Sequence, residues 1–264
     1  MPKIGVNGVE FYYELKGNGE PIVLISGYTG DHLNWSHIAA RLAKRFRVLT
    51  FDNQGTGQTT DDGAPLSIEA MADNTVVLAK ELGLTKFHVA GQSMGGSIVQ
   101  MIALNHPDAI ERAIISCSSP KWGTVVLDAF ETALKLLEQG TPPDLVYDVV
   151  APWCYGADFL SDTERAATRK REVLENPHPM SIANVRRQFE ALKGFDVRSE
   201  LERIKARALI ISASDDIVAT NAETMLLLEG ISSATRREIR GGHSIPTEKP
   251  DEWIDCVMEF LQIV

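Results

Sequence analysis

A serine flanked by glycines at residues 91–95 (GQSMG) is the strongest chemical signal in this sequence. It lies between the strand-like residues 86–90 and the helix-like residues 93–105. A G-x-S-x-G motif in this context presents a serine on a strained strand-to-helix turn, and its glycines leave the room that such a turn needs. We therefore expect Ser93 to be a nucleophile. The alternative is a glycine- and serine-rich helix start that only packs closely on the sheet.

A serine hydroxyl is a weak nucleophile at neutral pH, so it needs a base that is oriented by an acid. Of the six histidines, only His243 follows the strand-like residues 207–212, and it lies in a glycine-rich loop. Asp215 and Asp216 come directly after that strand. The order serine, acid, histidine is the one found when a nucleophile elbow carries a catalytic triad. We expect His243 to be the base and Asp215 the acid, with Asp216 as the alternative.

Attack by Ser93 on a carbonyl would create negative charge on oxygen, which backbone N–H groups can stabilise. The N–H of Met94, directly after the serine, is one candidate donor. The loop after the strand-like residues 21–26 supplies a second candidate, the N–H of Tyr28. The alternative for residues 27–30 is a plain turn.

Strand-like and helix-like stretches alternate through the first 119 residues, as expected for the elements that would position these groups. Residues 21–26 form a short apolar run of the kind buried on both faces of a parallel sheet. Ser67 can cap a helix that ends at Gly83. After residue 207 the alternation resumes, with a capping box at Thr220, a last strand at 235–239 and a closing helix at 251–261. The pattern predicts an α/β fold with a mostly parallel, doubly wound sheet of about eight strands.

Residues 120–196 interrupt this alternation with helical patterns and no convincing strand. Helices are expected at 123–139 and 180–192, and a capping box at 161–164 opens another helical stretch. Prolines separate these stretches. We predict a core formed by residues 1–119 and 197–264, with residues 120–196 inserted as a helical cap.

Composition narrows the class of protein further. The 264 residues include 26 basic and 36 acidic side chains, for a net charge of −10, and the basic residues form no long run. Nucleic acid is therefore not an expected partner. No stretch has the length and apolarity of a membrane span or a signal peptide, and the three cysteines lie far apart. We expect a cytoplasmic protein without a metal or cofactor, acting on a small molecule as a monomer or homodimer.

With these motifs in place, the sequence resembles the α/β-hydrolase-fold serine hydrolases over nearly the whole core. The resemblance rests on residues 26–28, 51–58, 91–96, 212–216 and 242–243. Within that fold it most resembles the bacterial group of 3-oxoadipate enol-lactonases, pimeloyl-ACP methyl ester esterases and aminoacrylate hydrolases. Ser26 stands where the family usually has histidine, and Gln54 where it commonly has arginine. The family pattern G-x-x-D, with Ser212 aligned to its glycine, places Asp215 at the acid.

The resemblance implies a cofactor-independent serine hydrolase that cleaves a carboxylic ester or lactone through an acyl-enzyme on Ser93. An alternative keeps the same triad but cleaves a C–N or C–C bond, as other branches of the family do. A third hypothesis, from a different class, is a ligand receptor on a hydrolase scaffold. The geometry of the cap, and not the triad motifs, would decide between the first two.

Overall fold

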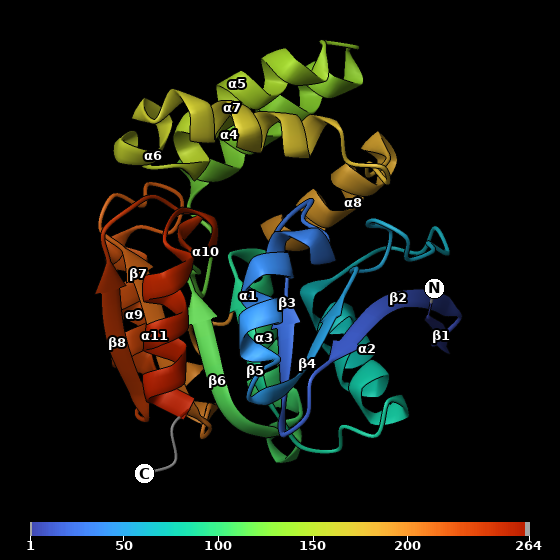
Figure 1. The fold of residues 1–264 in the computed structure, drawn as a ribbon, viewed down its shortest axis with the longest axis vertical. Helices are drawn as coiled ribbons and strands as arrows, with labels where there is room; N and C mark the ends of the chain where they lie inside the picture. The colour runs from blue at the N-terminus through green and yellow to red at the C-terminus, as the bar shows by residue number, and fades with distance from the viewer. Residues whose placement is uncertain (1, 262–264) are drawn as a thin grey trace.

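The computed structural model describes residues 2–261, which form one sheet of eight strands flanked by helices (Figure 1). The spatial order is β1-β2-β4-β3-β5-β6-β7-β8. Strand β2 pairs antiparallel with β1 and β4, and all other neighbours are parallel, which confirms the predicted sheet. The strands are β1 (Lys3–Val6), β2 (Val9–Lys16), β3 (Glu20–Ile25), β4 (Phe46–Phe51), β5 (Phe87–Gln92), β6 (Ile110–Ser116), β7 (Arg207–Ala213) and β8 (Ala234–Ile239).

Strand β3 shows how an unbroken apolar run builds the centre of this sheet. Successive side chains of a strand point to opposite faces. Accordingly, Ile22 and Leu24 belong to one buried cluster and Val23 and Ile25 to another, and all four are completely buried. Burying a side chain of this size stabilises the fold by about 1.5–3 kcal/mol. Both faces of the central strands therefore need a covering layer.

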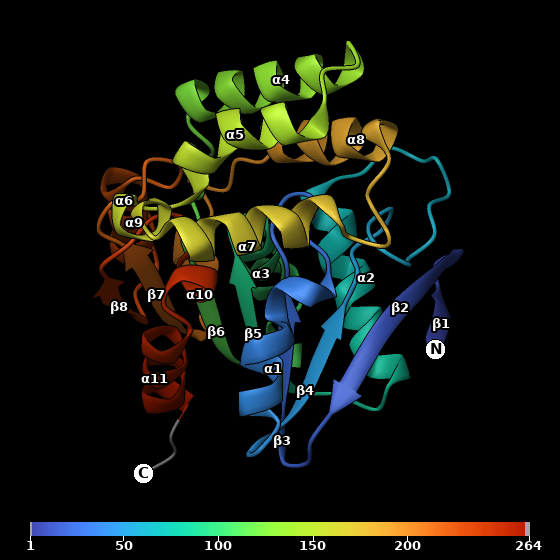
Figure 2. The ribbon, with the colours of Figure 1, turned by 45° about the horizontal axis from the view of Figure 1, so that its top comes forward.

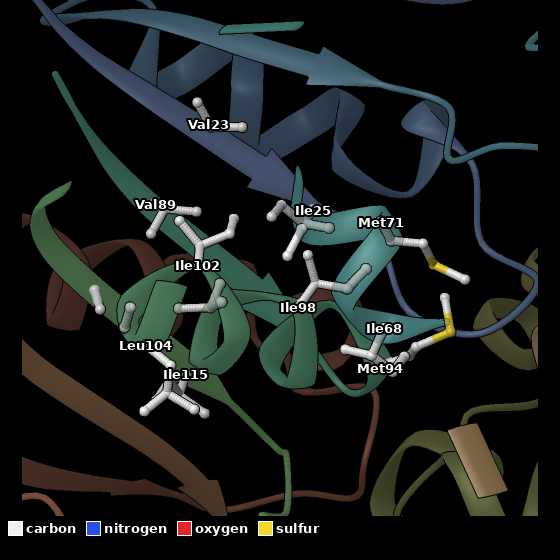
Figure 3. Close-up of a cluster of buried hydrophobic side chains, with 14 of the residues drawn as sticks. Val23, Ile25, Ile68, Met71, Val89, Met94, Ile98, Ile102, Leu104 and Ile115 are labelled. Carbon is white, nitrogen blue, oxygen red and sulfur yellow. The ribbon is translucent and has the colours of Figure 1, made fainter. Parts of the chain in front are cut away.

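Helices supply that layer on each face. One face is covered by α2 (Ile68–Glu81), α3 (Met94–Asn105) and α9 (Asn221–Gly230), and the other by α1 (Ser36–Leu42) and α11 (Pro250–Leu261). Figure 3 shows Ile98 and Ile102 of α3 in the same cluster as Val89 of β5 and Ile115 of β6. The helix that follows Ser93 is thus packed firmly on the sheet.

Five α-helices lie between β6 and β7, at the carboxyl ends of the parallel strands (Figures 1 and 2). At the neck of this segment, Lys121 and Asp196 form an isolated β-bridge and Val197 N–H donates to the carbonyl of Pro120 at 3.0 Å. We call residues 120–196 the inserted segment. We propose that it is the cap of a core formed by residues 1–119 and 197–264, of which 1 and 262–264 lie outside the described part. Its helices are α4 (Thr124–Glu138), α5 (Pro143–Cys154), α6 (Ala157–Ser161), α7 (Thr163–Leu174) and α8 (Ile182–Lys193).

Two local details of the inserted segment differ from the sequence predictions. Helix α5 begins with Pro143 in its first turn, where proline is tolerated, and continues through Pro152, so these prolines do not mark loops. Helix α7 is capped by the Asp162 carboxylate, which accepts from the N–H of Arg165, and not by Ser161. None of the helices described between residues 2 and 261 is long and apolar enough to cross a membrane.

Candidate active site

Ser93 occupies the sharp turn between β5 and α3. Its backbone angles are φ 58° and ψ −122°, a conformation that is costly for a residue with a side chain. The turn is held because Ser93 N–H donates to the carbonyl of Ser116 at 2.9 Å and the carbonyl of Ser93 accepts from Gly96 N–H at 2.8 Å. A strained serine fixed in this way between strand and helix is the arrangement of a nucleophile elbow.

The flanking glycines are needed because backbone passes directly over them. A Cβ atom on Gly91 would lie 2.1 Å from the carbonyl oxygen of Gly95. A Cβ atom on Gly95 would lie 2.2 Å from the carbonyl oxygen of Ile25, at the end of β3. Only glycine at these two positions allows α3 to begin so close to the sheet.

His243 and Asp216 complete a chain of hydrogen bonds that begins at Ser93. His243 Nε2 lies 2.8 Å from Ser93 Oγ, and His243 Nδ1 lies 2.9 Å from Asp216 Oδ2. All three residues are buried. Asp216 Oδ1 also accepts from the N–H groups of Val218 and Ala219, at 2.8 and 2.9 Å. These two backbone N–H groups therefore hold the carboxylate in place beside the imidazole.

Asp215, the acid expected from the sequence, does not contact His243, and the carboxylate that does is that of Asp216, the stated alternative. Strand β7 extends to Ala213, one residue further than predicted, and a turn at residues 214–215 follows it. Asp215 N–H donates to the carbonyl of Gly241 at 2.9 Å, while its side chain is exposed and, among the described residues, accepts only from Ser214. The extra strand residue and the turn make Asp216 the first side chain that points back to the imidazole.

The two expected backbone donors belong to Met94, which follows Ser93 in the chain, and to Tyr28, which follows Gly27. Met94 is the first residue of α3, and its side chain is buried with Ile68 and Met71 (Figure 3), so its position is fixed by the core. Tyr28 follows β3, and Gly27 beside it approaches the Ser93 side chain so closely that a Cβ atom there would lie 3.1 Å from Ser93 Cβ. Within residues 2–261, neither the Tyr28 N–H nor the Met94 N–H donates to another group of the protein.

A buried carboxylate that the sequence analysis did not single out holds the loop of His243. Both oxygens of Glu248 accept from Gly242 N–H, at 3.2 and 3.0 Å, and from Gly156 N–H of the inserted segment, at 3.3 and 3.2 Å. Burial raises the pKa of Glu248, and these backbone hydrogen bonds oppose that effect. Glu248 therefore ties the residue before His243 to the inserted segment.

Two other side chains shape the surroundings of His243. The ring of Trp122 stands edge-on to the imidazole, with centroids 6.4 Å apart, and its Nε1–H donates to Ser97 at 3.2 Å. Gln92 Nε2 donates to the carbonyl of His243 at 3.1 Å.

The Cys117 thiol is buried near Asp216. Burial raises the pKa of this thiol well above its ordinary value, and the Asp216 charge adds to this effect. In the described residues, no group of three or more His, Cys, Asp or Glu side chains is arranged to hold a metal ion.

Gln188 is a further buried polar residue that the sequence analysis missed. It lies in α8 among Val185, Phe189 and Leu192, which share one buried face at helical spacing. A glutamine on an otherwise apolar helical stripe indicates a buried polar side chain, and this pattern is present in the sequence. Its contacts are with loops more than 130 positions away in the sequence, at Thr29 and Thr56.

Known proteins that are similar to this chain in sequence and fold include hydrolases. Residues 20–250 match the family model described as "alpha/beta hydrolase fold". A protein of Rhizobium rhizogenes named "Putative carbamate hydrolase RutD" is 30% identical over 258 residues, covering 95% of this chain and 97% of its own.

Solved structures give the same result. The enol-lactonase of Burkholderia xenovorans LB400 superposes with a TM-score of 0.89 at 28% identity, covering 98% of this chain and 99% of its own. An esterase of Thermogutta terrifontis superposes with a TM-score of 0.87, over 99% of this chain and 98% of its own. At 20% identity that second likeness concerns the fold alone.

Proposed function

The chain belongs to the α/β-hydrolase family and is a hydrolase, and we propose that it cleaves a carboxylic ester or lactone through an acyl-enzyme on Ser93. The observation that carries this proposal is the continuous hydrogen-bond chain from Asp216 through His243 to Ser93, with contacts of 2.9 and 2.8 Å. In this proposal the chain's own side chains supply nucleophile, base and orienting acid, so the reaction needs no cofactor.

The first half-reaction transfers the acyl group to the enzyme. With the imidazole proton on Nδ1, His243 donates to the Asp216 carboxylate, and its bare Nε2 accepts the proton of Ser93. The bond from Ser93 Oγ to the substrate carbonyl carbon forms as that proton moves to Nε2. The carbon–oxygen bond to the leaving alcohol then breaks, and the alcohol oxygen takes the proton from Nε2.

The second half-reaction releases the acid. Water gives a proton to His243 Nε2 as its oxygen bonds to the acyl carbon, and the proton returns to Ser93 Oγ as the acyl bond breaks. In both halves the negative charge on the former carbonyl oxygen faces the N–H groups of Tyr28 and Met94. One such donor is worth about 10²–10³ in kcat.

A C–N substrate is the second candidate, favoured by the relative whose printed name is a carbamate hydrolase. A carbamate has the same carbonyl carbon for Ser93 to attack, with nitrogen on one side of it. Attack by Ser93 and breakage of the C–N bond would leave an alkoxycarbonyl group on Ser93, with the leaving amine taking the proton from His243 Nε2, or His243 would activate water directly. The third possibility, a receptor on this scaffold, would be recognised by slow turnover and tight binding of the product.

Replacement of Ser93 by alanine tests the proposal. We expect Ser93→Ala to lose ester turnover and labelling by a fluorophosphonate, because the only hydroxyl hydrogen-bonded to His243 Nε2 in the described chain is removed. Urea unfolding should show an intact fold. Wild-type rates in this variant would contradict the serine mechanism.

A substrate panel then separates the candidates. p-Nitrophenyl esters of increasing acyl length release p-nitrophenol by cleavage of a C–O bond, and the matching p-nitroanilides release p-nitroaniline by cleavage of a C–N bond, so their kcat/KM values compare the two bonds. A burst of one equivalent of p-nitrophenol, absent in Ser93→Ala, marks a covalent intermediate. A higher kcat/KM on the p-nitroanilides than on every ester would replace the ester by a C–N substrate.

A further inference from the structure

Gln188 joins two loops of the core, the one after β3 that carries Tyr28 and the one after β4 that carries Thr56. It belongs to α8 of the inserted segment and is completely buried. Its Oε1 accepts from the N–H of Thr29 at 3.0 Å, and its Nε2 donates to Thr56 Oγ1 at 2.8 Å. One side chain of the inserted segment thereby fixes a backbone N–H directly beside Tyr28.

Thr29 is in a conformation that needs such support. Its φ is +60°, in the left-handed region, where a β-branched residue is a genuine outlier. Strain of this kind persists only where surrounding groups over-determine it, and it gathers at functional sites. The hydrogen bond to Gln188 fixes the peptide between Tyr28 and Thr29, one peptide away from the N–H proposed to face the oxyanion.

The side chain of Tyr28 reaches the same helix. Its hydroxyl donates to the carbonyl of Val185 at 3.2 Å. Its ring lies against Phe189 of α8 and Phe130 of α4, with centroids 6.3 and 6.2 Å apart. Burial raises the pKa of the Tyr28 hydroxyl, so it stays a neutral donor. Both residues of this turn are thus anchored to the inserted segment and not only to the sheet.

We propose that Gln188 is a positioning residue for the oxyanion site, so that seating of α8 on the core sets the Tyr28 N–H in its working direction. This inference rests on the proposed function, because it assigns a partner to the charge that Ser93 attack would create. Donors stabilise such charge only when aimed at about 2.7–3.1 Å from the oxygen. A shift of about 1 Å in a catalytic group can cost about 10²-fold in rate.

The test is Gln188→Met, which keeps the length of the side chain and removes both polar contacts. On an ester that the wild type hydrolyses, we expect kcat to fall about 10- to 100-fold while KM stays within about threefold. A boronic acid forms an adduct with Ser93 that places a charged oxygen in the oxyanion site. Its affinity for the variant should fall by the same factor as kcat/KM. Gln139→Met, an exposed glutamine at the end of α4, is the matched control and should match the wild type.

Rescue separates positioning from simple packing. Gln188→Glu keeps an oxygen for the Thr29 N–H and can accept from the Thr56 hydroxyl, so it should recover a larger part of kcat than Gln188→Met does. If Gln188→Met fails to fold, Thr56→Val removes the group that orients the amide and should still lower kcat about threefold to tenfold. Thr56 is itself buried, so its fold is checked by urea unfolding.

The outcomes are distinct from those of the Ser93 experiment. Ester turnover that persists in Ser93→Ala would overturn the proposed function. Turnover that depends on Ser93 but a folded Gln188→Met with kcat within twofold of wild type would overturn only the positioning role. A change confined to KM, with boronic acid affinity unchanged, would also overturn it, since Gln188 would then act on ground-state binding alone.

Discussion

The neighbouring aspartates after β7 have opposite surroundings. The Asp216 carboxylate is buried and accepts from the N–H groups of Val218 and Ala219 in addition to facing His243. The Asp215 side chain is exposed and accepts a hydrogen bond from Ser214. An ionised carboxylate can only accept hydrogen bonds. Its contact with His243 Nδ1 therefore favours the tautomer of His243 that carries its proton on Nδ1.

The amide variants of these two residues should therefore differ strongly. Asp216→Asn offers an NH₂ group where only donors converge and disfavours the required tautomer, so kcat should fall by about 10²–10⁴. Asp215→Asn should stay within about tenfold of wild type, a change below about 1.4 kcal/mol. Measuring kcat of both on one activated ester checks this. The reverse ranking would return the acid role to Asp215.

At the scale of elements, the elbow depends on how closely α3 begins against β3. Gly95→Ala would place its Cβ 2.2 Å from the Ile25 carbonyl oxygen, so α3 or β3 must move. Overpacking typically costs about 1–3 kcal/mol, and a rigid backbone neighbour favours the upper end. Urea unfolding should show this loss of unfolding free energy, together with a fall in kcat because the adjacent Met94 N–H moves.

Gly5→Ala is the matched control for that experiment. Gly5 lies in the edge strand β1, and a Cβ atom there would have nothing within 4 Å. Its unfolding free energy should change by no more than about 0.5 kcal/mol. Equal effects of the two substitutions would mean that close packing at Gly95 is not what holds the elbow.

Whether a feature depends on local or on distant residues explains what could be predicted from the sequence. Ser93 and His243 each lie in a short motif whose local pattern specifies the turn, so the structure places them where they were expected. Which aspartate faces His243 depends on whether β7 ends at residue 212 or 213, and pairing with β8 decides this, not the local pattern. Gln188 acts through partners on two distant loops, so only its position on an apolar stripe was visible beforehand.

A second buried histidine, His32 in the short helix before α1, pairs with Asp52, the residue after β4. His32 Nδ1 lies 2.7 Å from Asp52 Oδ1, and the His32 backbone N–H donates to the same oxygen at 2.8 Å. The ring also packs on Tyr12, with centroids 4.7 Å apart. Burial acts against protonation, but the hydrogen bond and the charge of Asp52, aided by Asp31 and Glu14, prevail and raise the pKa of His32.

This raised pKa predicts how global stability depends on pH. The folded state holds the His32 proton more tightly than the unfolded state, whose histidine titrates near 6.5. The stabilisation is therefore complete below that value and is lost as pH rises through the raised pKa, with a slope of at most about 1.4 kcal/mol per pH unit. His32→Asn keeps a neutral donor toward Asp52 and cannot titrate. The unfolding free energy of both proteins can be measured in urea between about pH 5.5 and 8.5, which spans the titration range of histidine. The difference between the two proteins should favour the wild type most at the acidic end. A difference that stays flat or grows with pH would mean that the pKa of His32 is not raised in the folded protein.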